Sequence, residues 1–241
     1  MKGTNFANDL YDYIKGADDK NRLGPKRAVQ SQLISVQAMK QFTFFAFIVA
    51  ILCGIPLVIE GGYPILIIGI LSIISGYAYT AGPYPLGYNG WGDFFVFCFF
   101  GPIAVCGTYF LQTLSISLES IIAGIILGCL SVTLLCVNNI RDVETDRKVG
   151  KRTLAVRFGP TFIKYQYILC LVVASFLPIA IVYYSGQHTF LVLSAATLIF
   201  AFPSIQTVWK KTGESLNLAL ANTGKLLAIY TILFSIGWML P

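Results

Sequence analysis

Long apolar runs recur along almost the whole chain, and they restrict the folds that it can adopt. Seven runs of about 20 residues carry almost no charged side chain: 37–59, 62–81, 94–112, 117–137, 164–184, 188–209 and 223–240. A helix of that length crosses the hydrocarbon core of a bilayer and satisfies its backbone hydrogen bonds internally. The sequence therefore predicts an all-α, multi-span transmembrane helical bundle with seven full spans.

Composition supports a membrane protein and argues against a soluble one. Hydrophobic residues make up 56% of the 241, and the mean hydropathy is +0.73. A net charge of +6 would suggest nucleic acid binding in a soluble protein. Topology and an anionic ligand explain it better here, so we expect no nucleic acid partner. All six cysteines lie within or at the ends of apolar runs and form no CxxC pair, which favours packing roles.

The stretch 138–153 concentrates charge in a chain that is only 12% charged. Asn138, Asp142 and Asp146 are spaced four apart, so on a helix they form one stripe. Carboxylate and amide oxygens suit a hard cation such as Mg²⁺, which usually shares them with phosphate. Basic residues that suit the phosphate itself crowd the same turns: Arg141, Arg147, Lys148, Lys151 and Arg152.

A second cluster of the same chemistry lies near the N-terminus. An amide and carboxylates come first, and bases follow: Asn8, Asp9, Asp12, Asp18, Asp19, Arg22, Lys26 and Arg27. Gly16, Gly24 and Pro25 predict that the helix ends and that 18–27 is a loop. Each cluster alone is compatible with a solvated loop. Seven of the 11 acidic residues fall in these two windows, however, which favours two halves of one site.

Lys and Arg are absent between Gln41 and Ile140. Threading the seven runs through a membrane places every basic loop on one side and the turns without bases on the other. The positive-inside rule assigns the basic side to the cytoplasm and the C-terminus to the outside. Both acidic clusters then face the same side, as a shared site requires.

The loop 82–93 also lies on the predicted cytoplasmic side, but it carries no base. Its glycines and prolines argue against regular structure. Tyr84, Tyr88 and Trp91 are either anchors at the membrane interface or walls of a pocket near the acidic loops, and the sequence does not decide between the two.

Two acidic clusters with bases at a membrane surface describe a clamp for a diphosphate. Carboxylates hold Mg²⁺, Mg²⁺ bridges the diphosphate oxygens, and Lys and Arg neutralise the remaining charge. The apolar bundle offers room for a hydrocarbon tail, so polyprenyl diphosphate is the predicted ligand. Loss of diphosphate leaves an allylic carbocation, which aromatic faces stabilise.

The two motifs and several loops resemble the UbiA-type intramembrane aromatic prenyltransferases over nearly the whole chain. The first motif is Asn-Asp-Leu-Tyr-Asp at 8–12, and the second contains Asn138, Asp142 and Asp146. Within the superfamily, the chain is most similar to the 1,4-dihydroxy-2-naphthoate polyprenyltransferases of menaquinone biosynthesis. That similarity is carried by the segments 22–27, 79–88, 99–102, 138–142 and 150–157.

The resemblance implies Mg²⁺-dependent transfer from polyprenyl diphosphate to 1,4-dihydroxy-2-naphthoate, with loss of CO₂ and formation of demethylmenaquinone, in a prokaryotic plasma membrane. It implies that Asp12, Asp142 and Asp146 are catalytic. Six side chains are implied as metal ligands: Asn8, Asp9, Asp12, Asp18, Asp142 and Asp146. Seven are implied to contact substrates: Asn8, Arg22, Arg27, Tyr79, Asn138, Lys151 and Arg152.

The chain departs from the family pattern at two points. The family usually has nine membrane helices, and the similarity begins inside the second. We therefore expect residues 1–241 to form a single, N-terminally incomplete domain that starts with a partial helix. Many members also have Lys four residues after the tyrosine that matches Tyr79, where this chain has Pro83, a feature of the naphthoate branch.

Other functions fit parts of the pattern. The acceptor could be another ring, such as 4-hydroxybenzoate or homogentisate, and the chain could be an inactive lipid-binding fragment. A transporter or channel would place charges inside the membrane, whereas the long apolar runs here contain almost none.

Overall fold

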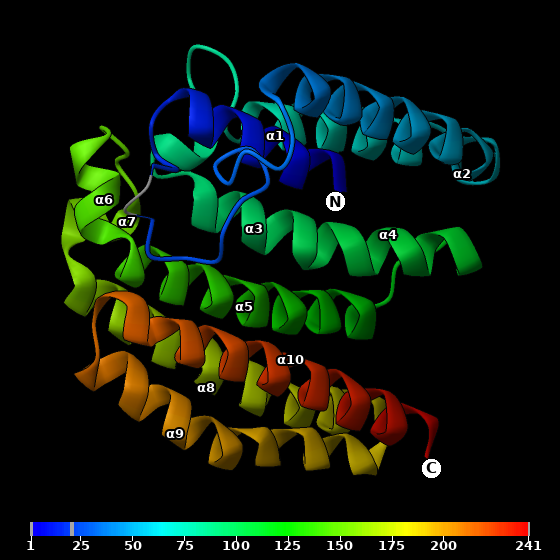
Figure 1. Cartoon of the computed structure of the whole chain (residues 1–241). Helices are drawn as coiled ribbons and strands as arrows, with labels where there is room; N and C mark the ends of the chain where they lie inside the picture. The colour runs from blue at the N-terminus through cyan, green and yellow to red at the C-terminus, as the bar shows by residue number, and fades with distance from the viewer. Residues whose placement is uncertain (1, 20–21, 241) are drawn as a thin grey trace.

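The computed structural model describes residues 2–19 and 22–240, and these residues contain no strand. Ten α-helices and three short 3₁₀ helices follow one another, as Figure 1 shows. The α-helices are α1 Lys2–Ile14, α2 Val36–Ala78, α3 Gly92–Phe100, α4 Pro102–Thr113, α5 Leu118–Arg141, α6 Val143–Lys148, α7 Leu154–Phe158, α8 Pro160–Ser185, α9 Thr197–Lys210 and α10 Leu216–Met239. The 3₁₀ helices are η1 Leu86–Tyr88, η2 Thr189–Ala196 and η3 Gly213–Ser215. The predicted all-α helical bundle is confirmed.

Six helical stretches of the described residues are long and apolar enough to cross a membrane. The predicted run 37–59 and all but the last three residues of the run 62–81 fall within α2. Its 43 residues would extend about 65 Å if straight, twice the thickness of a hydrocarbon core. Gly62 interrupts α2 with a φ of 64°, a conformation that favours glycine. The two halves lie side by side (Figure 1), and the ring centroids of Phe47 and Tyr77 are 6.3 Å apart. The count of seven spans remains a prediction.

Helix α5 is the central element of the bundle, with α3 and α4 on one side and α8 and α10 on the other (Figure 1). Its Ile126, Cys136 and Val137 are almost completely buried. Buried hydroxyls are paired across the bundle: Tyr167 and Thr223 are joined at 2.9 Å, and Tyr230 donates to the Ala174 carbonyl at 2.7 Å. Other buried hydroxyls bond within their own helix, as Thr133 does to the Leu130 carbonyl at 2.6 Å, so these core hydroxyls have partners.

Small residues allow α5 to approach the junction of α3 and α4. Gly101 separates these two helices, and a Cβ at that position would lie 2.6 Å from the Gly124 carbonyl oxygen of α5. A Cβ at Gly124 would lie 2.7 Å from the Cα of Pro102. Backbone therefore packs directly on backbone at this crossing.

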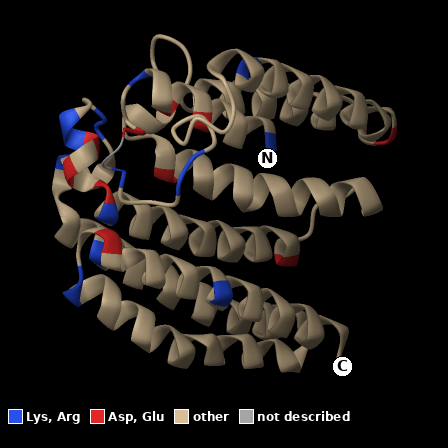
Figure 2. Cartoon of the chain, viewed as in Figure 1, with Lys and Arg blue, Asp and Glu red and all other residues tan. Residues whose placement is uncertain are grey.

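Charged residues gather at one end of the bundle, where α1, α6 and the adjoining loops meet (Figure 2). Glu60 and Glu119 lie toward the other end, next to turns that carry no Lys or Arg. All six cysteines lie within the described residues and are free. The expectation of no regular structure in the loop 82–93 was wrong in part, because η1 forms at Leu86–Tyr88 and α3 already begins at Gly92.

Gly124→Ala is expected to destabilise the protein by about 1–3 kcal/mol, because the added methyl group overlaps backbone atoms that cannot move independently. The thermal unfolding temperature of detergent-purified protein measures the effect. Gly107→Ala in α4 is the matched control, since nothing lies within 4 Å of its added Cβ. Equal unfolding temperatures of the two variants would contradict the close crossing.

Candidate active site

The loop that follows α1 returns to the helix and is bonded to Asp9. Gly16 has a φ of 74° and ends the helical segment. The Asp9 carboxylate then accepts hydrogen bonds from the backbone N–H groups of Ala28 and Val29, at 3.0 and 3.3 Å. These bonds hold the returning loop against α1, so Asp9 anchors the loop in this structure.

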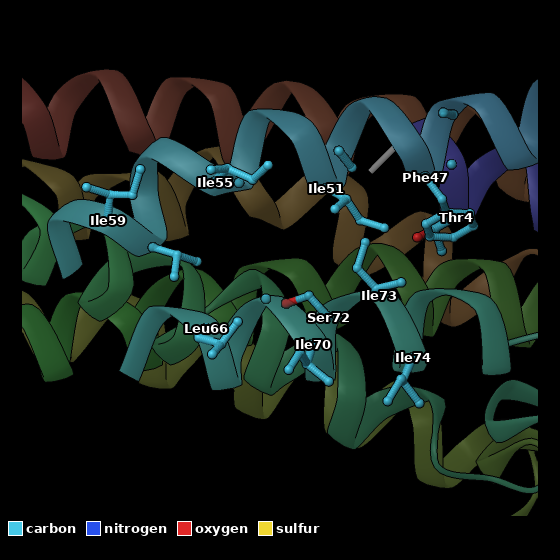
Figure 3. A pocket seen from close by; sticks show the side chains of 16 residues that line it. Thr4, Phe47, Ile51, Ile55, Ile59, Leu66, Ile70, Ser72, Ile73 and Ile74 are labelled. Carbon is cyan, nitrogen blue, oxygen red and sulfur yellow. The ribbon is translucent and has the colours of Figure 1, made fainter. Parts of the chain in front are cut away.

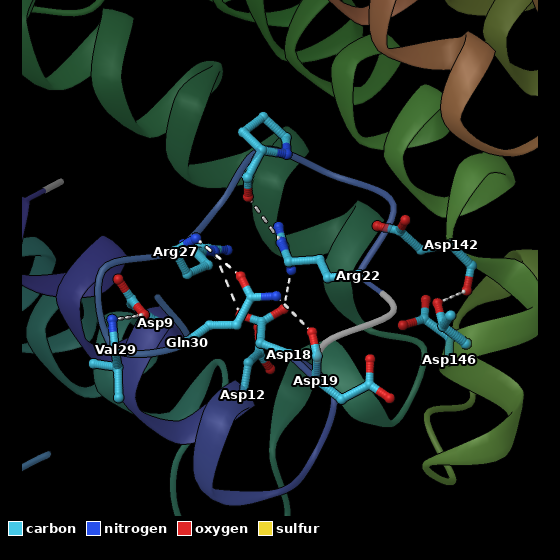
Figure 4. A network of polar contacts seen from close by, with 12 residues as sticks. Asp9, Asp12, Asp18, Asp19, Arg22, Arg27, Val29, Gln30, Asp142 and Asp146 are labelled. Carbon is cyan, nitrogen blue, oxygen red and sulfur yellow. Dashed lines mark hydrogen bonds and ion pairs between the residues drawn. The ribbon is translucent and has the colours of Figure 1, made fainter. Parts of the chain in front are cut away.

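Asp18 forms the centre of a basic cluster in that loop. It is 2% exposed and is paired with Arg22 and, at 3.5 Å, with Arg27. The Arg22 guanidinium is directed toward Asp18 and donates from Nε to the Pro25 carbonyl at 3.0 Å (Figure 4). Burial, followed by the neighbouring Arg27, lowers the pKa of Arg22, while Asp142 and Asp12 raise it. Arg22 therefore lies within the field of both acidic clusters.

The second acidic segment begins where α5 ends at Arg141. Helical i to i−4 bonds continue past this end, from Asp142 N–H to the Asn138 carbonyl at 2.9 Å and from Asp146 N–H to the Asp142 carbonyl at 2.8 Å. The predicted spacing of Asn138, Asp142 and Asp146 is therefore kept across the junction of α5 and α6. Asn138 itself is partly buried near the end of α5.

Asp142 is held by a buried arginine. Arg141 donates from Nε at 2.8 Å and from Nη2 at 2.7 Å to the two carboxylate oxygens of Asp142. Its Nη1 donates to Asn217 of α10 at 2.8 Å, and Asn217 in turn donates to the Leu23 carbonyl at 2.8 Å. This network joins the end of α5 to α10 and to the loop that follows α1.

Lys151 joins the two acidic segments. Its Nζ lies 3.4 Å from Asp12 Oδ1 and 3.6 Å from Asp146 Oδ1. Asp12 and Asp146 are more than a hundred positions apart in the sequence, and both are less than 8% exposed. The structure thus brings the two clusters together around one ammonium group.

Burial raises the pKa of Asp146 to about 6. Lys151 acts in the opposite direction, whereas the charges of Asp142 and Asp12 raise the pKa further. Desolvation penalises a carboxylate more than a single neighbouring cation compensates. A further positive charge or a metal ion at this position would remove the penalty.

Tyr88 lines the site. The sequence had left open whether it is an anchor at the membrane interface or the wall of a pocket. It is 8% exposed, and its hydroxyl donates to Asp12 Oδ1 at 2.8 Å. The ammonium groups of Lys15 and Lys151 each lie 4.7 Å from its ring centroid. Burial and the negative charge of Asp12 raise the pKa of Tyr88, which keeps its hydroxyl a donor. Tyr84 and Trp91, by contrast, are 59% and 49% exposed, as interface anchors are.

The remaining predicted residues lie around this centre. Asn8 accepts a hydrogen bond from the Thr80 hydroxyl at 2.9 Å. The Tyr79 phenol is within electrostatic range of Asp12 and Asp146. Arg152 points its side chain to the exterior, and its backbone N–H donates to the Tyr88 carbonyl at 2.7 Å.

Comparison with known proteins identifies the chain's relatives. A family model described as the UbiA prenyltransferase family matches residues 3–236. The chain belongs to the UbiA prenyltransferase family. It is 34% identical to "1,4-dihydroxy-2-naphthoate octaprenyltransferase" of Haemophilus influenzae, over 98% of the chain and 79% of the relative. The protein of the same name from Escherichia coli is 36% identical over 81% of the chain and 66% of the relative.

A mammalian relative is also similar to this UbiA family member. "UbiA prenyltransferase domain-containing protein 1" of Homo sapiens is 32% identical over 68% of the chain and 48% of the relative. The predicted family resemblance is thus confirmed for a bacterial naphthoate branch and extends to a protein outside bacteria.

Oxygen ligands for Mg²⁺ are available, but they are distributed. In the described part of the chain, no group of three or more His, Cys, Asp or Glu side chains converges as a metal site. Asp12 and Asp146 nevertheless both lie beside the ammonium group of Lys151, and both offer hard oxygen donors. Mg²⁺ is commonly bound by one or two carboxylates, with phosphate and water completing its octahedron. This donor set fits Mg²⁺ bound together with a diphosphate.

Four residues of this UbiA family member were not among the predicted site residues: Lys15, Tyr88, Arg141 and Asn217. Arg141 was named from the sequence only as a base suited to phosphate, and the structure shows that it is buried and bonded to Asp142. Lys15 donates to the Thr80 carbonyl at 2.6 Å, and Asn217 contacts Arg141. These two contacts join residues 65 and 76 positions apart, so no local pattern could have indicated them.

Asp146→Asn is expected to stabilise the metal-free protein by about 1–3 kcal/mol at pH 7.5. The folded pKa of Asp146 is raised, so its stabilising contribution is present below pH 4 and is lost as the pH rises through about 6. The difference in unfolding temperature should therefore disappear toward pH 4. Unfolding in EDTA between pH 4 and 8 measures it, with the exposed Glu144→Gln on the same helix as control. A pH-independent difference would contradict the assignment.

Proposed function

We propose that this protein transfers a polyprenyl group from polyprenyl diphosphate to 1,4-dihydroxy-2-naphthoate. The product is demethylmenaquinone in its reduced quinol form, with CO₂ and diphosphate released. The observation that carries this proposal is the convergence of Asp12 and Asp146 on Lys151, with Arg22 and Arg141 beside them. The names of the bacterial relatives support the choice of acceptor.

The diphosphate is bound where the two acidic segments meet. Lys151, Arg22 and Arg27 supply positive charge there, and all three are already held by carboxylates in the structure. Mg²⁺, when bound by the aspartates together with the diphosphate, neutralises the leaving group as its charge develops. Tyr88 holds Asp12 at 2.8 Å and so fixes the direction in which its carboxylate points.

Ionisation and ring attack follow from this arrangement. The allylic C–O bond breaks, and the diphosphate leaves with the electron pair. The Tyr79 ring, near the same carboxylates, stabilises the allylic cation through its aromatic face. The electron-rich ring of the naphthoate attacks the cation to form the new C–C bond. Loss of CO₂ from the same carbon returns an electron pair to the ring and restores its aromaticity.

The apolar tail needs a binding region next to the diphosphate. A cavity of about 580 Å³ lies between α1 and the two halves of α2, lined mostly by aliphatic side chains (Figure 3). Thr4 lies at its edge and precedes Asn8 by one turn of α1. We assign the tail to this cavity, because it adjoins the first acidic cluster and its lining is mostly apolar.

We further propose that the charged end of the bundle faces the cytoplasm of a prokaryote. Basic residues are concentrated at this end (Figure 2), as the positive-inside rule requires. Mg²⁺ and the polar diphosphate group of the lipid substrate then reach the site from the aqueous cytoplasmic side.

Asp12→Asn and Asp142→Asn are each expected to lower prenyl transfer about a hundredfold or more, because each removes a carboxylate that would hold the Mg²⁺ whose positive charge stabilises the diphosphate leaving group. The assay measures Mg²⁺-dependent transfer from polyprenyl diphosphate to 1,4-dihydroxy-2-naphthoate in membranes that express the chain. Glu214→Gln, an exposed acid at the same end, is the control. Parallel assays with 4-hydroxybenzoate and homogentisate determine the acceptor. Transfer to none of the three rings would refute the proposed function.

A further inference from the structure

A buried carboxylate at the start of α3 lies outside the two acidic clusters. Asp93 is 7% exposed, and Gln166 of α8 donates a hydrogen bond from Nε2 to its Oδ1 at 3.0 Å. Asp93 is also within electrostatic range of Cys136 on α5. It is therefore enclosed by α3, α5 and α8. A carboxylate inside a membrane bundle is costly, and such residues usually serve ligand or ion binding.

Gln166 adds an unsatisfied acceptor beside this carboxylate. Its Oε1 is buried and has no hydrogen-bond partner among the described residues. A buried amide oxygen without a donor is destabilising, and an ionised carboxylate can only accept hydrogen bonds. The pair therefore lacks a donor, such as the hydroxyl group of a ligand.

Space for an aromatic ligand adjoins Gln166. A cavity of about 430 Å³ on α8 is lined by Gln166 together with Phe162, Tyr165, Ile168, Leu169 and Val172. Its volume falls in the usual range for small-molecule sites, about 300–1,000 Å³. Phe162, Tyr165 and Leu169 are exposed on the lipid-facing surface, so an aromatic compound dissolved in the membrane can reach this cavity. Gln166 and Tyr165 are the lining residues with polar groups, and Gln166 carries the bond to Asp93.

Tyr79 connects this pair with the acidic clusters. Its hydroxyl lies only 2.8 Å from the position that a Cβ would take at Gly92, the residue before Asp93. The phenol is within electrostatic range of Asp93 as well as of Asp12 and Asp146. A ring held at Asp93 would therefore face the same tyrosine that borders the diphosphate site.

We propose that Asp93 and Gln166 bind a phenolic hydroxyl of the aromatic acceptor. The identity of that acceptor, 1,4-dihydroxy-2-naphthoate, rests on the proposed function. Its 1-hydroxyl is adjacent to its own carboxylate and bonds to it, whereas its 4-hydroxyl is free to donate to the protein. Because like charges repel, the carboxylate of the ligand points away from Asp93 and toward the basic side chains near Lys151.

A purely structural role for the pair makes a different prediction. The bond between Asp93 and Gln166 also links α3 to α8, and Asp93→Asn keeps this link because its amide oxygen still accepts from Gln166. A structural link alone would leave ligand binding unchanged in Asp93→Asn. The binding role requires a loss, because a hydrogen bond to a charged acceptor is stronger than one to a neutral amide.

The experiment compares two ligands on the wild type and on variants of the pair. Binding of 1,4-dihydroxy-2-naphthoate and of 1-hydroxy-2-naphthoate, which lacks the 4-hydroxyl, is followed by their own fluorescence on the chain in lipid nanodiscs. Asp93→Asn and Gln166→Leu are expected to weaken binding of the dihydroxy compound about tenfold. Binding of the monohydroxy compound should be the same in wild type and Asp93→Asn. Glu119→Gln and Gln112→Leu make the same chemical changes near the other end of the bundle and serve as controls.

Two results would overturn this inference: unchanged binding of the dihydroxy compound in Asp93→Asn, or equal weakening of both compounds. Because binding is measured without turnover, the inference is tested even if no prenyl transfer occurs. Selective loss of the dihydroxy compound without any transfer would support the binding site and count against the proposed function. Prenyl transfer by the wild type together with unchanged binding in Asp93→Asn would support the proposed function and count against the binding site at Asp93 and Gln166.

Discussion

Peptide groups cannot remain without hydrogen bonds in hydrocarbon, and the whole structure depends on this constraint. The long apolar segments are accordingly helical, and the charged loops collect at one end of the bundle. Where a helix is interrupted, at Gly62 and Gly101, a glycine provides the backbone conformation or the space that the break requires. Polar chemistry is thereby confined to one end, above an apolar bundle that can hold a hydrocarbon chain.

Charge burial is the second constraint at that end. Asp18 is paired with Arg22 and Arg27, Asp142 with Arg141, and both Asp12 and Asp146 with Lys151. Removing one partner of a buried pair leaves an uncompensated charge, so these pairs fix the loops relative to one another. The same bases are suited to a diphosphate, because a phosphate group can replace a carboxylate as their partner. Asp93 differs from these acids, because it accepts a hydrogen bond from the amide of Gln166 rather than pairing with a base.

The sequence predicted the positions of the acidic segments well, but it could not predict how their side chains are used. The spacing of Asp142 and Asp146 placed them one turn apart, and the structure keeps that spacing. Each of the two acids has a different basic partner: Asp142 is paired with the buried Arg141, and Asp146 lies beside Lys151. Asp9, predicted as a metal ligand, accepts two backbone hydrogen bonds from the loop after α1. Its contribution to metal binding stays a prediction.

Hydropathy, residue spacing and the distribution of bases by themselves determined a helical membrane bundle with two acidic segments at one end. These properties depend on residues that are close in sequence, and a local pattern contains them. Tertiary structure alone decided that Tyr88 holds Asp12, that one lysine joins α1 to α6, and that Asp93 meets Gln166. The physical reason is that the contacts of Asp12 with Tyr88 and Lys151, and of Asp93 with Gln166, link positions 73 to 139 apart, which become neighbours only when the helices pack around α5.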